Sequence, residues 1–125
     1  MLSLTELESK IPASAEASVL ARELYEDMAA RFDALGIDLD ADTELMVSNH
    51  ILCLAKRIET GEFVDPLDEV LFSEVSQSAR DKSRSIMEPA FERCERPVDS
   101  TEMLMMATHI EVALAKMAQA AGETA

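Results

Sequence analysis

Two short segments of similar sequence each place a histidine among apolar residues. Residues 45–51 read Leu-Met-Val-Ser-Asn-His-Ile, and residues 104–110 read Leu-Met-Met-Ala-Thr-His-Ile. His50 and His109 are the two histidines of the 125-residue chain. A neutral imidazole is nucleophilic and titrates near neutral pH, so a histidine can accept a phosphoryl group. The repeated pattern is therefore compatible with a pair of phosphoacceptor sites.

A cation follows each histidine at the same spacing. Arg57 lies seven residues after His50, and Lys116 lies seven residues after His109. On a helix this spacing is about 10.5 Å along the axis, too far for a tight contact. Long helical side chains lean toward the N-terminus, so each cation is expected to lean toward its histidine and stabilise an anion there. Glu102 precedes His109 and leans away from it, so we expect it to cap its own helix; a contact with a histidine must cross between helices.

The two histidines have other interpretations. As core residues they would bond to the backbone and only stabilise the fold. As metal ligands, His50, His109 and Glu102 would supply three donors, but no helix carries a Glu-x-x-His pair. We therefore expect no metal, no cofactor and no enzymatic activity, with a small metal-dependent enzyme as the lowest-ranked alternative.

Composition limits the partners. The formal net charge is −14 and no basic patch is visible, which disfavours direct binding to nucleic acids and to anionic membranes. No apolar run approaches the length of a membrane span. Cys53 and Cys94 are far apart and form no Cys-x-x-Cys motif, which favours two reduced thiols in a cytoplasmic protein.

Apolar periodicity and capping residues predict one compact all-α domain with short connections. Three glycines and four prolines are few for a many-stranded fold. The expected helices span residues 14–35, 42–60, 65–74, 75–96 and 100–121, between an N-terminal extension (1–13) and a C-terminal tail (122–125). The helix at 42–60 is apolar around most of its circumference and should be buried on several sides, within the bundle or by a second subunit.

Capping and breaking residues define the expected helix ends. They are the N-cap Asp42, the terminator Gly61, the helix start Asp65-Pro66, the interior proline Pro89 (which should kink or shorten its helix), the capping box of Asp99 and Glu102, and the terminator Gly122.

Taken in order, these features resemble the PTS regulation domain (PRD) family. Its members are helical domains of bacterial transcription antiterminators and activators controlled by the phosphotransferase sugar-uptake system. The resemblance covers about residues 14–120. It depends on His50-Ile51, Arg57, Gly61, Asp65-Pro66-Leu67, Glu102 and His109-Ile110.

The resemblance implies a five-helix bundle with two antiparallel pairs, residues 14–35 with 75–96 and 42–60 with 100–121, plus a short connecting helix. It implies a homodimer with the histidines at or near its interface. His50 and His109 match the phosphoacceptor positions of the family, and the donors would be HPr, the phosphocarrier protein, or a phosphorylated sugar-permease component. Phosphorylation would shift the dimer between active and inactive arrangements.

The chain also departs from the family pattern. Asp65 stands where the family usually has Asn, and Lys116 is not a strict family position. A single PRD without an attached RNA- or DNA-binding domain would act through a separate regulator protein. The alternative is a structural or protein-interaction module that keeps the PRD fold without phosphoryl transfer. Of the two histidines, His50 has the better-supported site, because Arg57 leans toward it and matches the family.

Overall fold

The computed structural model of the protein describes residues 1–63 and 65–123, apart from the side chains of residues 13, 14 and 123. Within these residues the chain forms five α-helices, two short 3-10 helices and no strand, which confirms the predicted all-α bundle. The elements are α1 (Leu4–Lys10), η1 (Pro12–Glu16), α2 (Val19–Ala34), α3 (Ala41–Thr60), η2 (Glu69–Phe72), α4 (Gln77–Arg93) and α5 (Ser100–Glu123).

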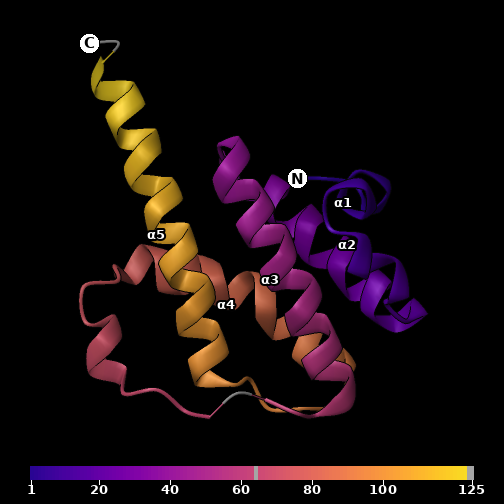
Figure 1. Ribbon diagram of the computed structural model, residues 1–125. Helices are drawn as coiled ribbons and strands as arrows, with labels where there is room; N and C mark the ends of the chain where they lie inside the picture. Colours follow the sequence, from indigo (N-terminus) through magenta and orange to yellow (C-terminus); the bar gives the residue numbers. More distant parts are fainter. Residues whose placement is uncertain (64, 124–125) are drawn as a thin grey trace.

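α3 and α5 lie beside each other and run in opposite directions, and α4 crosses behind them (Figure 1). α2 packs on the other side of α3, and the last turns of α5 extend beyond the rest of the bundle (Figure 1). The expected pairs, α2 with α4 and α3 with α5, are both in contact. Neighbours in sequence, α2 with α3 and α4 with α5, pack against each other more extensively still.

The core lies where the helices face one another. On α2 Leu24, Met28 and Phe32, which follow one another at steps of four residues, are fully buried. Leu20 and Leu35 continue the same spacing, but Leu20 is only partly buried and Leu35 is exposed. On α3 the buried residues point to more than one side of the helix, as expected for a helix that is apolar around most of its circumference. They are Thr43, Val47, Ser48, His50, Ile51, Leu52, Leu54, Ala55 and Ile58.

The N-terminal segment packs against the helical body of the protein. Ser3 and Glu6 form a capping box at the start of α1. Leu7 on this helix is fully buried, and the Tyr25 hydroxyl donates to the Leu2 carbonyl oxygen at 2.8 Å. α2 begins at Val19, later than expected, because the Ser18 side chain accepts from a backbone N–H in its first turn.

The ends of α3 are set by Asp40 and Gly61. Asp40, not Asp42, is the N-cap, because its carboxylate accepts from the Thr43 N–H at 2.8 Å. Gly61 ends the helix as predicted, with a φ of +77°, a left-handed conformation that glycine adopts without strain.

The expected α-helix after Asp65-Pro66 does not form. Instead, the 3-10 helix η2 begins after Asp68, whose side chain accepts from the Val70 N–H. Residue 64, at the start of this connection, lies outside the described residues. The acids around Pro66 are exposed, so little packing opposes this shorter turn.

The last two helices also differ from expectation at their ends. α4 is capped by Ser76, continues through Pro89 and ends at Arg93, so it is shorter than residues 75–96 at both ends. α5 continues past Gly122 to Glu123, and residues 124 and 125 of the predicted tail lie outside the described residues. No helix in the described part of the chain has the length and apolar character needed to cross a bilayer.

Candidate functional site

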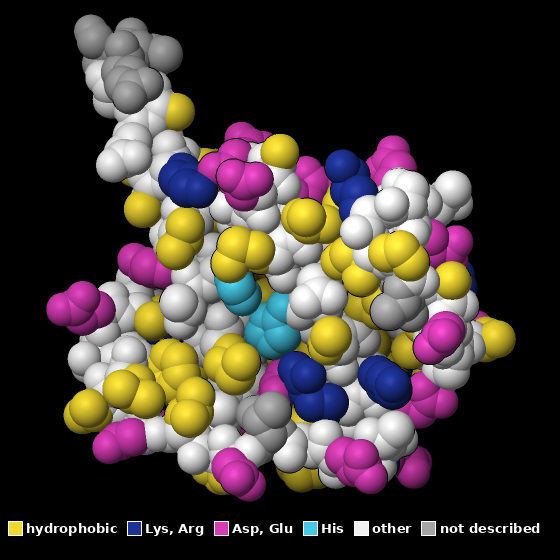
Figure 2. Space-filling model, viewed as in Figure 1, with side chains coloured by type: hydrophobic (Ala, Val, Ile, Leu, Met, Phe, Trp, Pro, Cys, Tyr) yellow, Lys and Arg dark blue, Asp and Glu magenta, His cyan; other side chains and the backbone are white. Residues whose placement is uncertain are grey.

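The two histidines come from neighbouring helices and meet. His50 on α3 and His109 on α5 have ring centroids 5.3 Å apart, with their planes inclined at 59°. Figure 2 shows the histidines together on one face of the molecule, with hydrophobic and basic side chains around them. His50 is 9 % exposed, whereas His109 is only partly buried. The repeated sequence pattern therefore builds one site from two helices.

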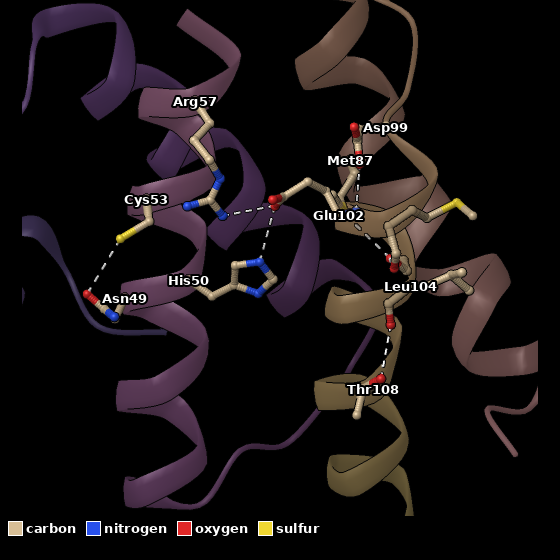
Figure 3. Close-up of polar contacts among 11 residues, drawn as sticks. Asn49, His50, Cys53, Arg57, Met87, Asp99, Glu102, Leu104 and Thr108 are labelled. Carbon is tan, nitrogen blue, oxygen red and sulfur yellow. Dashed lines mark hydrogen bonds and ion pairs between the residues drawn. The ribbon is translucent and has the colours of Figure 1, made fainter. Parts of the chain in front are cut away.

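Glu102 crosses from α5 to α3 and joins this site. Its Oε2 lies 2.9 Å from Arg57 Nη2 and 3.4 Å from His50 Nε2 (Figure 3). The Glu102 side chain is 0 % exposed. Asp99 Oδ1 accepts from the Glu102 N–H at 2.9 Å, so one half of the expected capping box forms. The expected capping role of the Glu102 side chain is wrong, because its carboxylate binds the cation and imidazole of α3 instead.

The partners of Glu102 determine its charge. Burial raises the pKa of Glu102, but the hydrogen bonds from His50 and Arg57 and the guanidinium charge together outweigh burial and lower that pKa. Glu102 is thus a carboxylate at neutral pH, and a carboxylate only accepts hydrogen bonds. His50 Nε2 therefore carries the hydrogen that faces Glu102. The other ring nitrogen, Nδ1, is buried and has no hydrogen-bond partner.

His109 has a different environment. Burial lowers the pKa of His109, and the nearby His50 lowers it further. His109 is therefore neutral at pH 7 and one of its nitrogens bears a lone pair. No described residue forms a hydrogen bond with the His109 ring. Neither ring nitrogen of His109 is both buried and without a partner. At least part of each ring nitrogen of His109 therefore reaches the surface.

The two cations take up different positions. Arg57 leans toward His50 as predicted and reaches the carboxylate that His50 also contacts. Lys116 does not lean toward His109. It forms an ion pair with Asp40 and donates to Thr43 Oγ1 at 3.1 Å.

The antiparallel packing explains this correction. It places the later part of α5 beside the start of α3, where Asp40 attracts the ammonium group of Lys116. The hydrogen bond from Lys116 lowers the pKa of Asp40. Lys116 is therefore engaged away from His109 in this structure, and its stabilisation of an anion on His109 stays a prediction.

Two other kinds of site have less support. Within residues 1–63 and 65–123, no three His, Cys, Asp or Glu side chains are grouped so that they could hold a metal ion. A cavity of about 350 Å³ lies between the N-terminal segment and α3, and Leu52, Cys53 and Lys56 are in its wall. Neither histidine lines this cavity.

Sequence reasoning found His50, His109, Arg57 and Glu102, and the structure brings all four together. It missed the partnership of Glu102 with Arg57 and His50, because the contact joins residues 45 and 52 positions apart. The one sequence feature that pointed to this contact was an acidic residue, Glu102, at the start of an apolar helix. Comparisons with known protein families, curated proteins and solved structures found no match for this chain.

Proposed function

We propose that the protein is a regulatory domain of the PRD type, phosphorylated on histidine by proteins of the phosphotransferase system. The observation that carries this proposal is the meeting of His50 and His109, 5.3 Å apart, beside the ion pair of Arg57 with the buried Glu102. Two histidines that are distant in sequence and lie together next to a guanidinium group suit a phosphoryl-accepting site. The order of family motifs in the sequence supports the same function.

Phosphorylation of a histidine at this site changes the local charge strongly. A phosphoryl group adds up to about two negative charges at neutral pH. The chain already carries a formal net charge of −14, and at the site Glu102 adds a buried carboxylate. Phosphorylation therefore disturbs the balance around Arg57 and changes how this face packs against another surface.

The surroundings of the site suit a packing surface. Met46, one turn before His50, and Val112, one turn after His109, are both large exposed apolar side chains. Hydrophobic side chains surround the histidines in Figure 2. We infer that this face forms the homodimer interface, or the interface with a separate regulator protein, and that the modified histidine alters it. Such an output needs no bound nucleic acid or membrane and fits a cytoplasmic protein.

The test is transfer from the expected donors. The purified chain is incubated with phosphorylated HPr or with a phosphorylated sugar-permease component, and acid-labile phosphate is measured by intact mass. We expect one or more phosphoryl groups on the wild-type chain and none on the His50→Ala/His109→Ala double variant. Sedimentation before and after labelling then shows whether the oligomeric state changes. Equal labelling of the double variant would contradict the proposal.

A second candidate function has one observation in its favour. His50 is nearly fully buried, and its Nε2 already contacts Glu102, which is the environment of a structural core histidine. On this view the protein is an interaction module with the same fold and no phosphoryl transfer. It predicts that neither donor labels the chain, while sedimentation shows a stable dimer.

A further inference from the structure

The two histidines differ in ways that assign the reacting residue. We propose that His109 is the single phosphoacceptor of the chain and that His50 is not modified in the folded protein. This inference rests on the proposed function and sharpens it. It also reverses the preference for His50 that the sequence pattern suggests.

His50 offers no free nitrogen to a donor. Its Nε2 is turned toward the Glu102 carboxylate at 3.4 Å, and the hydrogen between them leaves no lone pair there. Its Nδ1 is buried from solvent and has no hydrogen-bond partner. Phosphoryl transfer places the attacking atom, the phosphorus and the leaving atom roughly in line, so the donor must approach the nucleophile directly. His50 cannot be approached in this way without opening the bundle.

His109 meets these requirements. Its ring is only partly buried, and no hydrogen bond within the described chain occupies either nitrogen. Thr108 and Val112, its neighbours on α5, are exposed, so the helix presents this region to the surface. A neutral ring with an accessible lone pair is the form of histidine that attacks phosphorus.

Phosphoryl transfer to His109 exchanges the N–P bond of the donor for a new N–P bond. The lone pair of one His109 nitrogen forms a new N–P bond, and the N–P bond of the donor phosphohistidine breaks. The electrons of the broken bond return to the donor imidazole, which takes up a proton from water. The second nitrogen of His109 keeps its hydrogen, so the product is a phosphohistidine on α5 and a free donor histidine.

The charges near the site oppose a second phosphoryl group. The His50 ring is only 5.3 Å from His109, so two modified rings would bring two dianions into contact. Arg57 is already paired with Glu102, and Lys116 is already paired with Asp40. A second phosphoryl group would therefore lie beside the first one and beside the buried Glu102 carboxylate. Neither Arg57 nor Lys116 would be free to pair with it.

The experiment uses phosphoramidate, a small N–P compound that phosphorylates accessible neutral imidazoles without a protein donor. The full chain is treated in buffer at pH 8, and separately in urea after unfolding. Labelled sites are mapped by peptide mass in alkali, where phosphohistidine survives. In the folded chain we expect His109 to react at least about tenfold faster than His50, because access to His50 requires local opening. In urea the two rates should be similar.

Variants provide a second measurement. His109→Ala should abolish labelling of the folded chain, and His50→Gln, which keeps an amide donor for Glu102, should keep it. Circular dichroism verifies that each variant folds. If either variant fails to fold, the site mapping of the wild-type chain decides the matter by itself.

The outcomes separate this inference from the proposed function. Comparable labelling of His50 in the folded chain, two phosphoryl groups per folded chain, or labelling of His109 only after unfolding would each overturn the inference. If phosphoramidate labels His109 but HPr and the permease component do not, the assignment of the acceptor stands and the proposed function fails. If these donors label His50 alone, the proposed function stands and the assignment fails.

Discussion

Replacement of Glu102 by Gln tests whether the carboxylate holds the site together. The substitution keeps the size of the side chain and one acceptor oxygen, but it removes the charge shared by Arg57 and His50. Arg57 is 23 % exposed, so water partly replaces its lost partner, whereas His50 at 9 % exposure gains little from water. A hydrogen bond to a charged group contributes about 1.5–3 kcal/mol, so we expect the free energy of unfolding to fall by about 2–3 kcal/mol at pH 7.

Urea unfolding followed by circular dichroism measures this difference. The matched control is Glu92→Gln, which removes a negative charge from an exposed position on α4 and should change the unfolding free energy by less than about 0.5 kcal/mol. A Glu102→Gln variant as stable as this control would refute the assigned ion pair.

The pH dependence of the same pair of proteins gives a second check. The pKa of Glu102 in the folded protein is lowered from 4.5, so its contribution to stability is complete above about pH 4.5. That contribution is lost as the pH falls through the lowered pKa, because the carboxylate becomes protonated. The difference in stability between wild type and Glu102→Gln should therefore shrink below pH 4.5. A difference that stays constant into acid would show that Glu102 does not act as a carboxylate.

Three further predictions concern the surroundings of the site. NMR titration of the His109 ring should give a pKa below 6.5, because the ring is partly buried and faces a second imidazole; a value at or above 6.5 would contradict this. Lys116→Ala should leave labelling of His109 unchanged and cost less than about 1 kcal/mol in unfolding free energy, because Lys116 and its carboxylate partner are about half exposed. A marked loss of labelling would restore the role first predicted for this lysine. Gly61→Ala should destabilise the protein by about 1 kcal/mol more than Gly36→Ala, as measured by urea unfolding, because the Arg96 guanidinium would have to shift from its hydrogen bond to the Ile58 carbonyl oxygen. Both glycines have positive φ, but only a Cβ at position 61 would approach a side chain, the Arg96 guanidinium at 2.7 Å. Equal costs would show that this approach is harmless.

The fold was accessible from the sequence because burial follows local periodicity. Leu24, Met28 and Phe32 recur at steps of one helical turn, and this spacing both predicts α2 and identifies its buried face. Gly61 was predicted for a similar reason, since few residues other than glycine adopt its backbone conformation at low cost.

Helix starts were predicted less well because several residues near each start can cap a helix. Asp40 and Asp42 are equally suitable in sequence, and the backbone selects Asp40. Asp65-Pro66 is a strong local signal, but residues 67–71 remain exposed and only Phe72 of this segment is buried, so no helical face is buried here. Without that burial a short segment gains too little to form α-helix, so the chain makes only a 3-10 turn at η2.

The site shows why two similar segments need not act alike. Because α3 and α5 are antiparallel, the cation that follows each histidine meets an acid near the start of the opposite helix: Arg57 meets Glu102, and Lys116 meets Asp40. The two cations correspond in sequence, but the two ion pairs differ in burial.

Glu102 is completely buried, so it can orient an imidazole, whereas Asp40 and Lys116 are about half exposed and act mainly on each other. Glu102 binds the Nε2 of His50, and the Nδ1 of His50 is buried without a partner, whereas no hydrogen bond within the described residues occupies the partly exposed ring of His109. Under the proposed assignment, the histidine with the better-matched cation is the one that does not react, because its Nε2 is bound to Glu102 and its Nδ1 is buried.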